Sequence, residues 1–175
     1  MLELLAPAGN LDAVIAAVQN GADAVYMGFG DGFNARRSAD NFTRESFAKA
    51  VRYCHIRGCK VYVTLNTLVG DREMDAAAAL AQQASDAGAD AILVQDLGLA
   101  RVLRAALPDI PLHASTQMSI HNLAGVEAAA EMGITRAVLA RELSLEQIRF
   151  ISQHASIETE VFVHGALCFC YSGQC

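Results

Sequence analysis

Three cysteines stand close together at the end of the sequence, at positions 168, 170 and 175. They directly follow the apolar run 160–163, which predicts a strand. Thiolates at such spacing bind soft metals or iron–sulfur clusters. A tetrahedral zinc site takes four ligands, as does a cluster of four irons, so these cysteines supply part of such a site. We refer to residues 164–175 as the cysteine segment.

Polar side chains also follow the other predicted strands, at the point where each strand ends. In a βα barrel these ends meet on one rim, where the active site lies. The sequence therefore predicts that these side chains line a common site. For substrate binding we expect Arg36, Asn66, Gln95, Asp96, Ser115, Gln117 and Arg141, and for catalysis His113, His164 and Glu142. Asn34 and Arg37 lie on the same loop as Arg36.

The arginines of this set are suited to hold an anionic group. Arg36, Arg37 and Arg141 carry guanidinium forks, which match carboxylates and phosphates bidentately. We therefore expect a carboxylated or phosphorylated ligand at this rim.

Each of these residues also has a plain structural interpretation. Asp96 and Ser115 could cap the helices that follow them, and His113 could be a buried core residue. Arg141 and Glu142 could form a structural ion pair. Cys54 and Cys59 lie on or after the second predicted helix, far from this rim, and we expect them to be buried or free thiols.

Short apolar runs alternate with helical patterns along almost the whole chain. The expected strands are 2–6, 24–27, 60–65, 91–94, 112–115, 137–140 and 160–163. The expected helices are 11–20, a helix between Thr43 and Gly58, 76–87, 97–107, a helix between Asn122 and Gly133, and 144–154 with a capping box at Ser144 and Gln147.

This alternation predicts a parallel sheet with right-handed crossovers. Seven regularly spaced strands, without a glycine-rich dinucleotide fingerprint after the first, favour a (β/α) barrel over a doubly wound sheet. A complete barrel takes about 250 residues. We therefore expect an incomplete TIM-like (β/α) barrel that lacks its last unit. We expect 1–175 to be a single domain, the N-terminal barrel portion of a longer protein.

Composition narrows the function classes. The 175 residues are 53% hydrophobic and 18% charged with a net charge of −6, and no block of lysine and arginine occurs. Clustered basic charge is what phosphate neutralisation needs, so this stretch alone does not resemble a nucleic-acid platform. No secretory signal and no run long enough to span a membrane is visible, and five cysteines are an odd number. We expect a cytoplasmic protein with no membrane contact.

The cysteine segment and its preceding strand resemble the defining motif of peptidase family U32, the collagenase-like peptidases. The motif positions present here are Glu160, Phe162, Gly165, Ala166, Leu167, Cys168, Gly173 and Cys175. The stretches 3–9, 21–26, 113–117 and 141–144 are also similar to the family. The resemblance covers the whole chain.

The resemblance implies two kinds of activity. Some family members are labelled collagenases without an assigned mechanism, and others are oxygen-independent hydroxylases of transfer RNA, ribosomal RNA or a quinone precursor. In the hydroxylases four cysteines hold a four-iron–four-sulfur cluster, and prephenate is implicated as a donor for the RNA reactions. Cys168 and Cys175 match the first two of those ligands, and Cys170 departs from the usual pattern. The remaining ligands are expected beyond residue 175, so the cluster is expected to be absent from this fragment.

We favour hydroxylation over proteolysis. Under it, Arg36 and Arg141 would hold the carboxylated donor, and His113 and His164 would transfer protons. A protease needs an activated nucleophile, for which Cys168 and His164 are the candidate pair, and no zinc-protease motif is present. A third possibility is that the isolated fragment has no activity and associates with itself through the open seam left by the missing unit. The substrate of the full-length protein would be RNA or a peptide.

Overall fold

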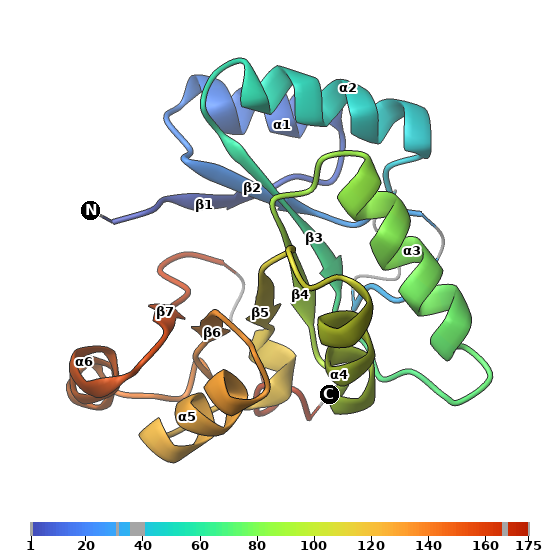
Figure 1. Cartoon of the computed structure of the whole chain (residues 1–175). Coiled ribbons are helices and arrows are strands. Elements are labelled where there is room, and N and C mark those ends of the chain that lie inside the picture. Colours follow the sequence, from blue (N-terminus) through green and yellow to red (C-terminus); the bar gives the residue numbers. More distant parts are fainter. Residues whose placement is uncertain (1, 31, 36–40, 166–167, 175) are drawn as a thin grey trace. The chain divides into compact units, whose positions relative to one another are not determined.

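The computed structural model describes residues 2–30, 32–35, 41–165 and 168–174 (Figure 1). Its strands are β1 (Leu5–Pro7), β2 (Ala24–Met27), β3 (Lys60–Leu65), β4 (Ala91–Val94), β5 (Leu112–Ala114), β6 (Arg136–Val138) and β7 (Glu158–Glu160). Its helices are α1 (Leu11–Gln19), α2 (Arg44–His55), α3 (Met74–Asp86), α4 (Leu97–Ala106), the short 3₁₀ helix η1 (Thr116–Met118), α5 (Leu123–Glu131) and α6 (Leu145–His154).

The strands follow one another through the sheet in chain order, β1 to β7. The ladders β1–β2, β2–β3, β5–β6 and β6–β7 are parallel, and a helix separates each strand from the next along the chain. This is the topology of a (β/α) barrel that lacks its last unit, as the sequence predicted. Contacts divide the chain into two compact units, Met1–Leu93 and Val94–Cys175, and each is described by itself. Whether 1–175 folds as one domain stays a prediction.

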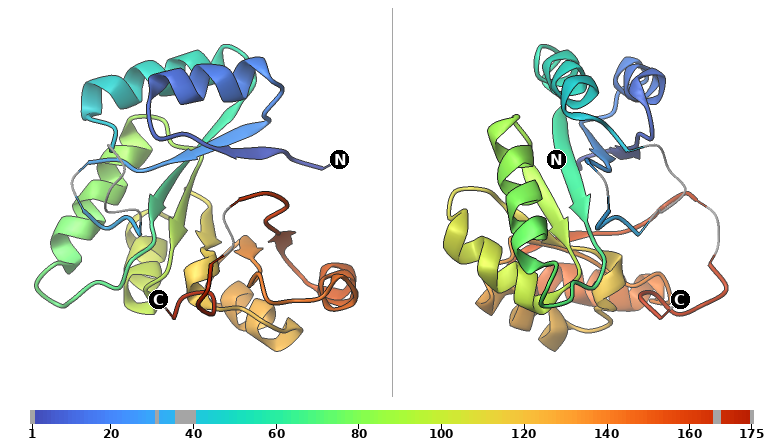
Figure 2. Two further views of the ribbon diagram at one scale, coloured as in Figure 1. Left: turned by 180° about the vertical axis from the view of Figure 1, so that it is seen from behind. Right: turned by 90° about the vertical axis from the view of Figure 1, so that its right-hand side faces the viewer.

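In the first unit, α1 and α2 lie side by side over β1 to β3, as the views of Figures 1 and 2 agree. Asn10 and Thr43 cap these helices by accepting hydrogen bonds from the backbone of Ala13 and Ser46, as the sequence predicted. Gly58 ends the α2 region with φ +71°, a conformation that favours glycine. The caps and the glycine stop set where β3 begins.

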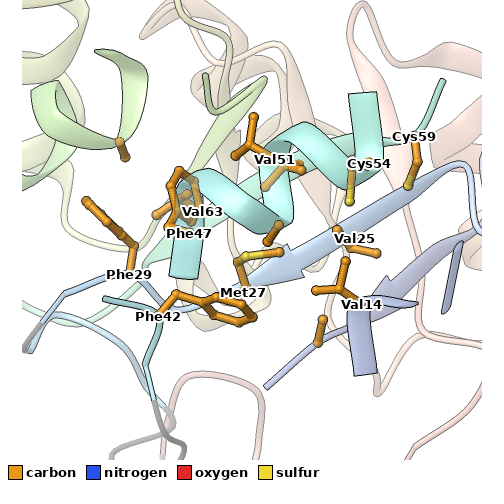
Figure 3. Close-up of a cluster of buried hydrophobic side chains, with 14 residues drawn as sticks. Val14, Val25, Met27, Phe29, Phe42, Phe47, Val51, Cys54, Cys59 and Val63 are labelled. Atoms are coloured by element: carbon orange, nitrogen blue, oxygen red, sulfur yellow. The ribbon is translucent and has the colours of Figure 1, made fainter. Parts of the chain in front are cut away.

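The core of the first unit packs between these helices and strands (Figure 3). Phe47 is completely buried, and its ring centroid lies 4.6 Å from that of Phe29. The sulfur-bearing side chains of Cys54 and Cys59 lie at one end of the cluster, and both are buried free thiols as expected. Burial of a side chain such as Phe47 stabilises the fold by about 1.5–3 kcal/mol. This packing holds the strand ends of the first unit in place.

In the second unit, capping residues again determine where the helices begin. Asn122 caps α5 by accepting a hydrogen bond from Gly125, and Ser144 with Gln147 forms the predicted capping box of α6. Buried Arg136 on β6 bonds to Glu158 at 2.6 Å and lies 3.5 Å from Glu160, so both acidic residues of β7 are tied to β6.

Four strand predictions need correction, the smallest of which is β5, since it ends at Ala114, one residue before the predicted end. Strand β7 spans Glu158–Glu160 instead of 160–163, because the β6 ladder and Arg136 select the earlier residues; Val163 is 86% exposed. Strand β6 likewise begins at Arg136 and ends at Val138, two residues before the predicted end. Strand β1 spans Leu5–Pro7 instead of 2–6, since the ladder with β2 starts at Leu5 and Leu2 is 96% exposed.

Candidate functional site

The described part of the cysteine segment is exposed except at Ser172, which is buried, and Gly173, which is half-buried. Ser172 is 3% exposed, whereas Cys168, Cys170 and Tyr171 are exposed. All three polar groups of Ser172 bond to neighbours from distant parts of the second unit. Its N–H donates to Glu142 Oε1 at 2.6 Å, its Oγ accepts from the Arg141 N–H at 3.2 Å, and its carbonyl accepts from Ser119 Oγ. Ser172 is therefore the point at which the cysteine segment is fastened to the second unit.

Two loops at the ends of β5 and β6 supply these partners. After β5, buried Ser115 caps η1 by accepting from the Gln117 N–H, and Ser119 then takes a left-handed conformation with φ +58°. A non-glycine residue in this conformation is uncommon and costs free energy, which the contacts of Ser119 offset. The left view of Figure 2 shows the red end of the chain beside η1.

His121 joins the same two loops. Its Nδ1 lies 2.6 Å from the Ser119 carbonyl oxygen, which can only accept, so Nδ1–H is the donor. The opposite ring nitrogen, Nε2, faces Glu142 Oε2 at 3.4 Å, and it can donate to this carboxylate only in the imidazolium form, since Nδ1 already carries the proton bonded to Ser119. The imidazole thus lies between the loop after β5 and the carboxylate that holds Ser172.

Both oxygens of Glu142 are engaged within this network. Partial burial acts to raise the pKa of Glu142, but hydrogen bonds from its own N–H and from the N–H and hydroxyl of Ser172, together with nearby His121, outweigh it. The pKa of Glu142 therefore lies below its ordinary value. Glu142 therefore accepts the hydrogen bond from the Ser172 N–H as an ionised carboxylate at neutral pH.

Gly173 lies against the backbone of the loop after β5. It adopts φ +77°, and a Cβ at this position would overlap the Gln117 carbonyl oxygen and Ser119 Oγ. Any other residue would strain its own backbone and push the segment away from η1. The glycine of the motif therefore has a structural reason: it allows the close approach that lets neighbouring Ser172 reach its partners.

The exposed thiols of the cysteine segment have the chemistry and the accessibility that a metal site needs. Cys168 and Cys170 are exposed thiols outside any disulfide, and soft metals and iron–sulfur clusters are held by such groups. Cys175 lies outside the described residues. No group of three or more histidine, cysteine, aspartate or glutamate side chains within the described residues could hold a metal ion. The donor type fits a cluster, and the described residues supply only part of the ligand set.

The remaining predicted residues of the second unit have different surroundings. The guanidinium carbon of Arg141 lies 5.7 Å from the centre of the Phe162 ring, and His164 is exposed. Asp96 caps α4 by accepting from the Leu99 N–H at 2.8 Å, and His113 on β5 is only 4% exposed. The capping interpretation of Asp96 and Ser115 is confirmed, while their substrate contacts stay a prediction. Gln95 is half-buried directly before Asp96.

In the first unit, asparagines organise the loop between β2 and α2. Buried Asn34 donates to Asn41 Oδ1 at 3.1 Å, and Asn66 after β3 accepts from the Ala35 N–H at 3.1 Å. The two amides of Asn34 and Asn41 lie where a Cβ on Gly28 would be. Asn66 therefore has a structural role in this loop. Arg36 and Arg37, expected on the same loop, lie outside the described residues.

Sequence reasoning missed three members of the network around the cysteine segment. Ser119, His121 and Ser172 did not stand out because none of them directly ends a strand. A signal was present: the polar residues from Ser115 to Asn122 continue well past the end of β5. Such a run is longer than a helix cap needs.

A model of peptidase family U32 matches residues 9–175. Among curated proteins, the chain is 45% identical over 174 residues to the 23S rRNA 5-hydroxycytidine C2501 synthase of Escherichia coli, and 42% identical over 173 residues to tRNA hydroxylation protein P1 of Bacillus subtilis. It is also 34% identical over 185 residues to a collagenase of Porphyromonas gingivalis. Each match covers 99% of this chain but only 26%, 41% and 44% of the respective relatives. The chain thus spans less than half the length of the relatives it matches.

Solved structures support the fold class. The U32 peptidase Mk0906 has a TM-score of 0.74 at 17% identity, over 92% of this chain and 68% of that structure. A glycerophosphodiester phosphodiesterase from Galdieria sulphuraria has a TM-score of 0.64 at 10% identity, over 92% and 84%. At such identities these likenesses bear on the fold alone.

Proposed function

Because this chain belongs to peptidase family U32, we propose that it works in the oxygen-independent hydroxylation of RNA, with an iron–sulfur cluster as cofactor. The substrate would be a base of transfer or ribosomal RNA. The observation that carries the proposal is the identity of 45% and 42% to two proteins named for RNA hydroxylation. Other relatives named for tRNA hydroxylation are 34% to 38% identical, the same range as the 36% and 34% of two relatives named as a protease and a collagenase.

The cysteine segment is where we place the cofactor. Cys168 and Cys175 would be two ligands of a four-iron–four-sulfur cluster, in keeping with the exposure of Cys168 and with the anchoring of the segment through Ser172. When bound, the cluster would supply the electron-transfer chemistry of the reaction. Cys170 is not proposed as a ligand.

The residues around the segment would bind and orient the reactants. Arg141, whose guanidinium lies beside Phe162, would hold the carboxylate of a small organic donor such as prephenate, together with Arg36. Gln117, Ser115 and Gln95 would contact the substrate. His113 and His164 would move protons, and the exposure of His164 leaves it accessible to a ligand.

Charge bears on how RNA would be held. With a net charge of −6, this chain has little to neutralise phosphates, so parts of the protein beyond this chain would supply most RNA contacts. Among the described residues, no helix is both long and apolar enough to cross a membrane. An RNA substrate would place the protein in the cytoplasm.

Proteolysis is the second candidate, because two relatives are named as a protease and a collagenase. Anaerobic iron–sulfur reconstitution of the full-length protein, followed by iron analysis and a gelatin-cleavage assay, separates the two. The proposal expects bound iron that is lost in Cys168→Ala and Cys175→Ala, retained in Cys54→Ala, and no gelatin cleavage. Gelatin cleavage without iron uptake, abolished by Cys168→Ala, would favour the protease instead.

A further inference from the structure

The network around Ser172 connects three segments that are far apart in the sequence. They are the loop after β5, the loop between β6 and α6, and the cysteine segment. Among the described residues of the cysteine segment, only Ser172 has less than one tenth of its surface exposed. The hydrogen bonds of Ser172 therefore restrain the adjacent backbone, which carries Cys170 two residues away and Cys168 four residues away.

The order of contacts runs through one imidazole and one carboxylate. The Ser119 carbonyl accepts from His121 Nδ1–H, His121 Nε2 faces Glu142 Oε2, and Glu142 Oε1 accepts from the Ser172 N–H. The chain of contacts closes on itself, because Ser119 Oγ also donates to the Ser172 carbonyl. A closed set of contacts restricts its members more than the same contacts would singly.

We propose that His121 and Glu142 are positioning residues for the cysteine segment: the imidazolium of His121 orients the Glu142 carboxylate, and Glu142 holds Ser172 and with it the thiols. This inference deepens the proposed function and rests on it only in taking the cysteine segment as the reactive part. It also changes the role expected of Glu142. A carboxylate whose two oxygens are occupied by His121 and Ser172 acts through the segment it holds.

The physical reason for such a device is preorganisation. A metal or substrate site needs its ligands held close to the productive geometry by supporting hydrogen bonds. Exposed backbone would otherwise lose that geometry to conformational entropy. A carboxylate accepting a backbone N–H is among the stronger supports available, because the acceptor is ionised.

The test is amide hydrogen exchange of residues 168–174 in the purified 175-residue chain, which needs no iron and no RNA. Replacing Glu142 with alanine removes the acceptor, so the Ser172 amide should exchange about 10- to 100-fold faster, as expected for losing a hydrogen bond to a charged partner. Glu142→Gln keeps an acceptor oxygen and should recover much of the protection. Glu146→Ala, which removes an exposed glutamate on α6, is the matched control and should change nothing.

The role of His121 is tested by a second pair of variants. His121→Phe keeps a planar ring without polar atoms, and the Ser172 amide should exchange up to about fivefold faster, the range for a partly exposed ion pair. His121→Gln can again donate to Glu142 and should restore protection. Exchange in α4, which belongs to the same unit as the cysteine segment, serves as the reference for the stability of that unit and should be the same in all variants.

Two outcomes would overturn the inference. One is unchanged exchange at 168–174 in Glu142→Ala. The other is equal acceleration at 168–174 and in α4, which would mean general destabilisation of the second unit. If the predicted pattern is found but the protein binds no iron–sulfur cluster and modifies no RNA, the positioning role stands and the proposed function falls.

Discussion

The Ser172 N–H donates to Glu142 Oε1 at 2.6 Å across thirty residues of sequence. This contact fastens an exposed, cysteine-bearing segment to a loop at the end of β6. Ser172 lies between Cys170 and Gly173, the glycine of the family motif. The motif therefore combines residues of two kinds, metal-binding candidates and residues that anchor the backbone. Its cysteines offer thiols, and Gly173 lets the backbone come close enough to be anchored.

Gly173→Ala should detach the segment. The substitution combines a left-handed backbone with an overlap against the Gln117 carbonyl, so we expect a local cost of about 1–3 kcal/mol. Amide exchange at 168–174 measures this cost. Gly9→Ala is the control, because Gly9 has an ordinary φ and open space around it, and its effect should stay within about 0.5 kcal/mol. Equal effects of the two substitutions would contradict the role given to Gly173.

The described cysteines should divide into two reactivity classes. Cys168 and Cys170 are exposed, whereas Cys54 and Cys59 are buried, and burial raises the pKa of both buried thiols. Brief treatment of the native chain with iodoacetamide, followed by peptide mass spectrometry, should label the first pair and leave the second unlabelled until denaturant is added. Rapid native labelling of Cys54 would show that the core of the first unit opens readily.

Alkaline pH should weaken the first unit through Cys54. Desolvation by burial, followed by the influence of neighbouring Cys59, raises the pKa of Cys54 from 9.0 to about 12. A thiol whose pKa is higher in the folded state stabilises the fold fully below the unfolded pKa, and this contribution is lost as pH rises toward the folded pKa.

Denaturant unfolding between pH 9.0 and about 12 measures this loss. The wild-type chain should lose stability more steeply with pH than Cys54→Ala, although the variant starts from a lower stability because of its cavity. Parallel pH profiles would show that Cys54 ionises alike in the folded and unfolded chain.

The isolated chain should associate with itself. Strands β1 and β7 end the sheet order, and exposed strand edges template pairing with another chain. Light scattering of the purified chain at concentrations well above micromolar should therefore report dimers or larger species. A monomer under those conditions would contradict this prediction.

The fold could be predicted from sequence because its signals are local. Asn10, Thr43, Asn122 and Ser144 cap helices where the sequence placed them, and β3 and β4 have the predicted bounds. The ends of β1, β6 and β7 could not be predicted, because ladder pairing decides them; for β7, Arg136 on another strand also contributes.

The candidate site was predicted in type more than in arrangement. The thiols and Glu142 were found because cysteine spacing and strand ends are visible in one dimension. The contacts of Ser172 with Ser119, Arg141 and Glu142 join residues at least thirty positions apart, and no local pattern encodes them. Whether the predicted substrate-binding residues contact substrate stays a prediction.

Nucleoside mass spectrometry of cellular RNA tests the central claim most directly. Transfer and ribosomal RNA would be analysed from cells lacking the gene and from the same cells complemented with wild type, Cys168→Ala or Cys54→Ala. We predict that one pyrimidine loses the mass of an oxygen atom on deletion, and that wild type and Cys54→Ala restore it while Cys168→Ala does not. An unchanged set of RNA nucleosides in the deletion strain would contradict the proposal that this chain works in RNA hydroxylation.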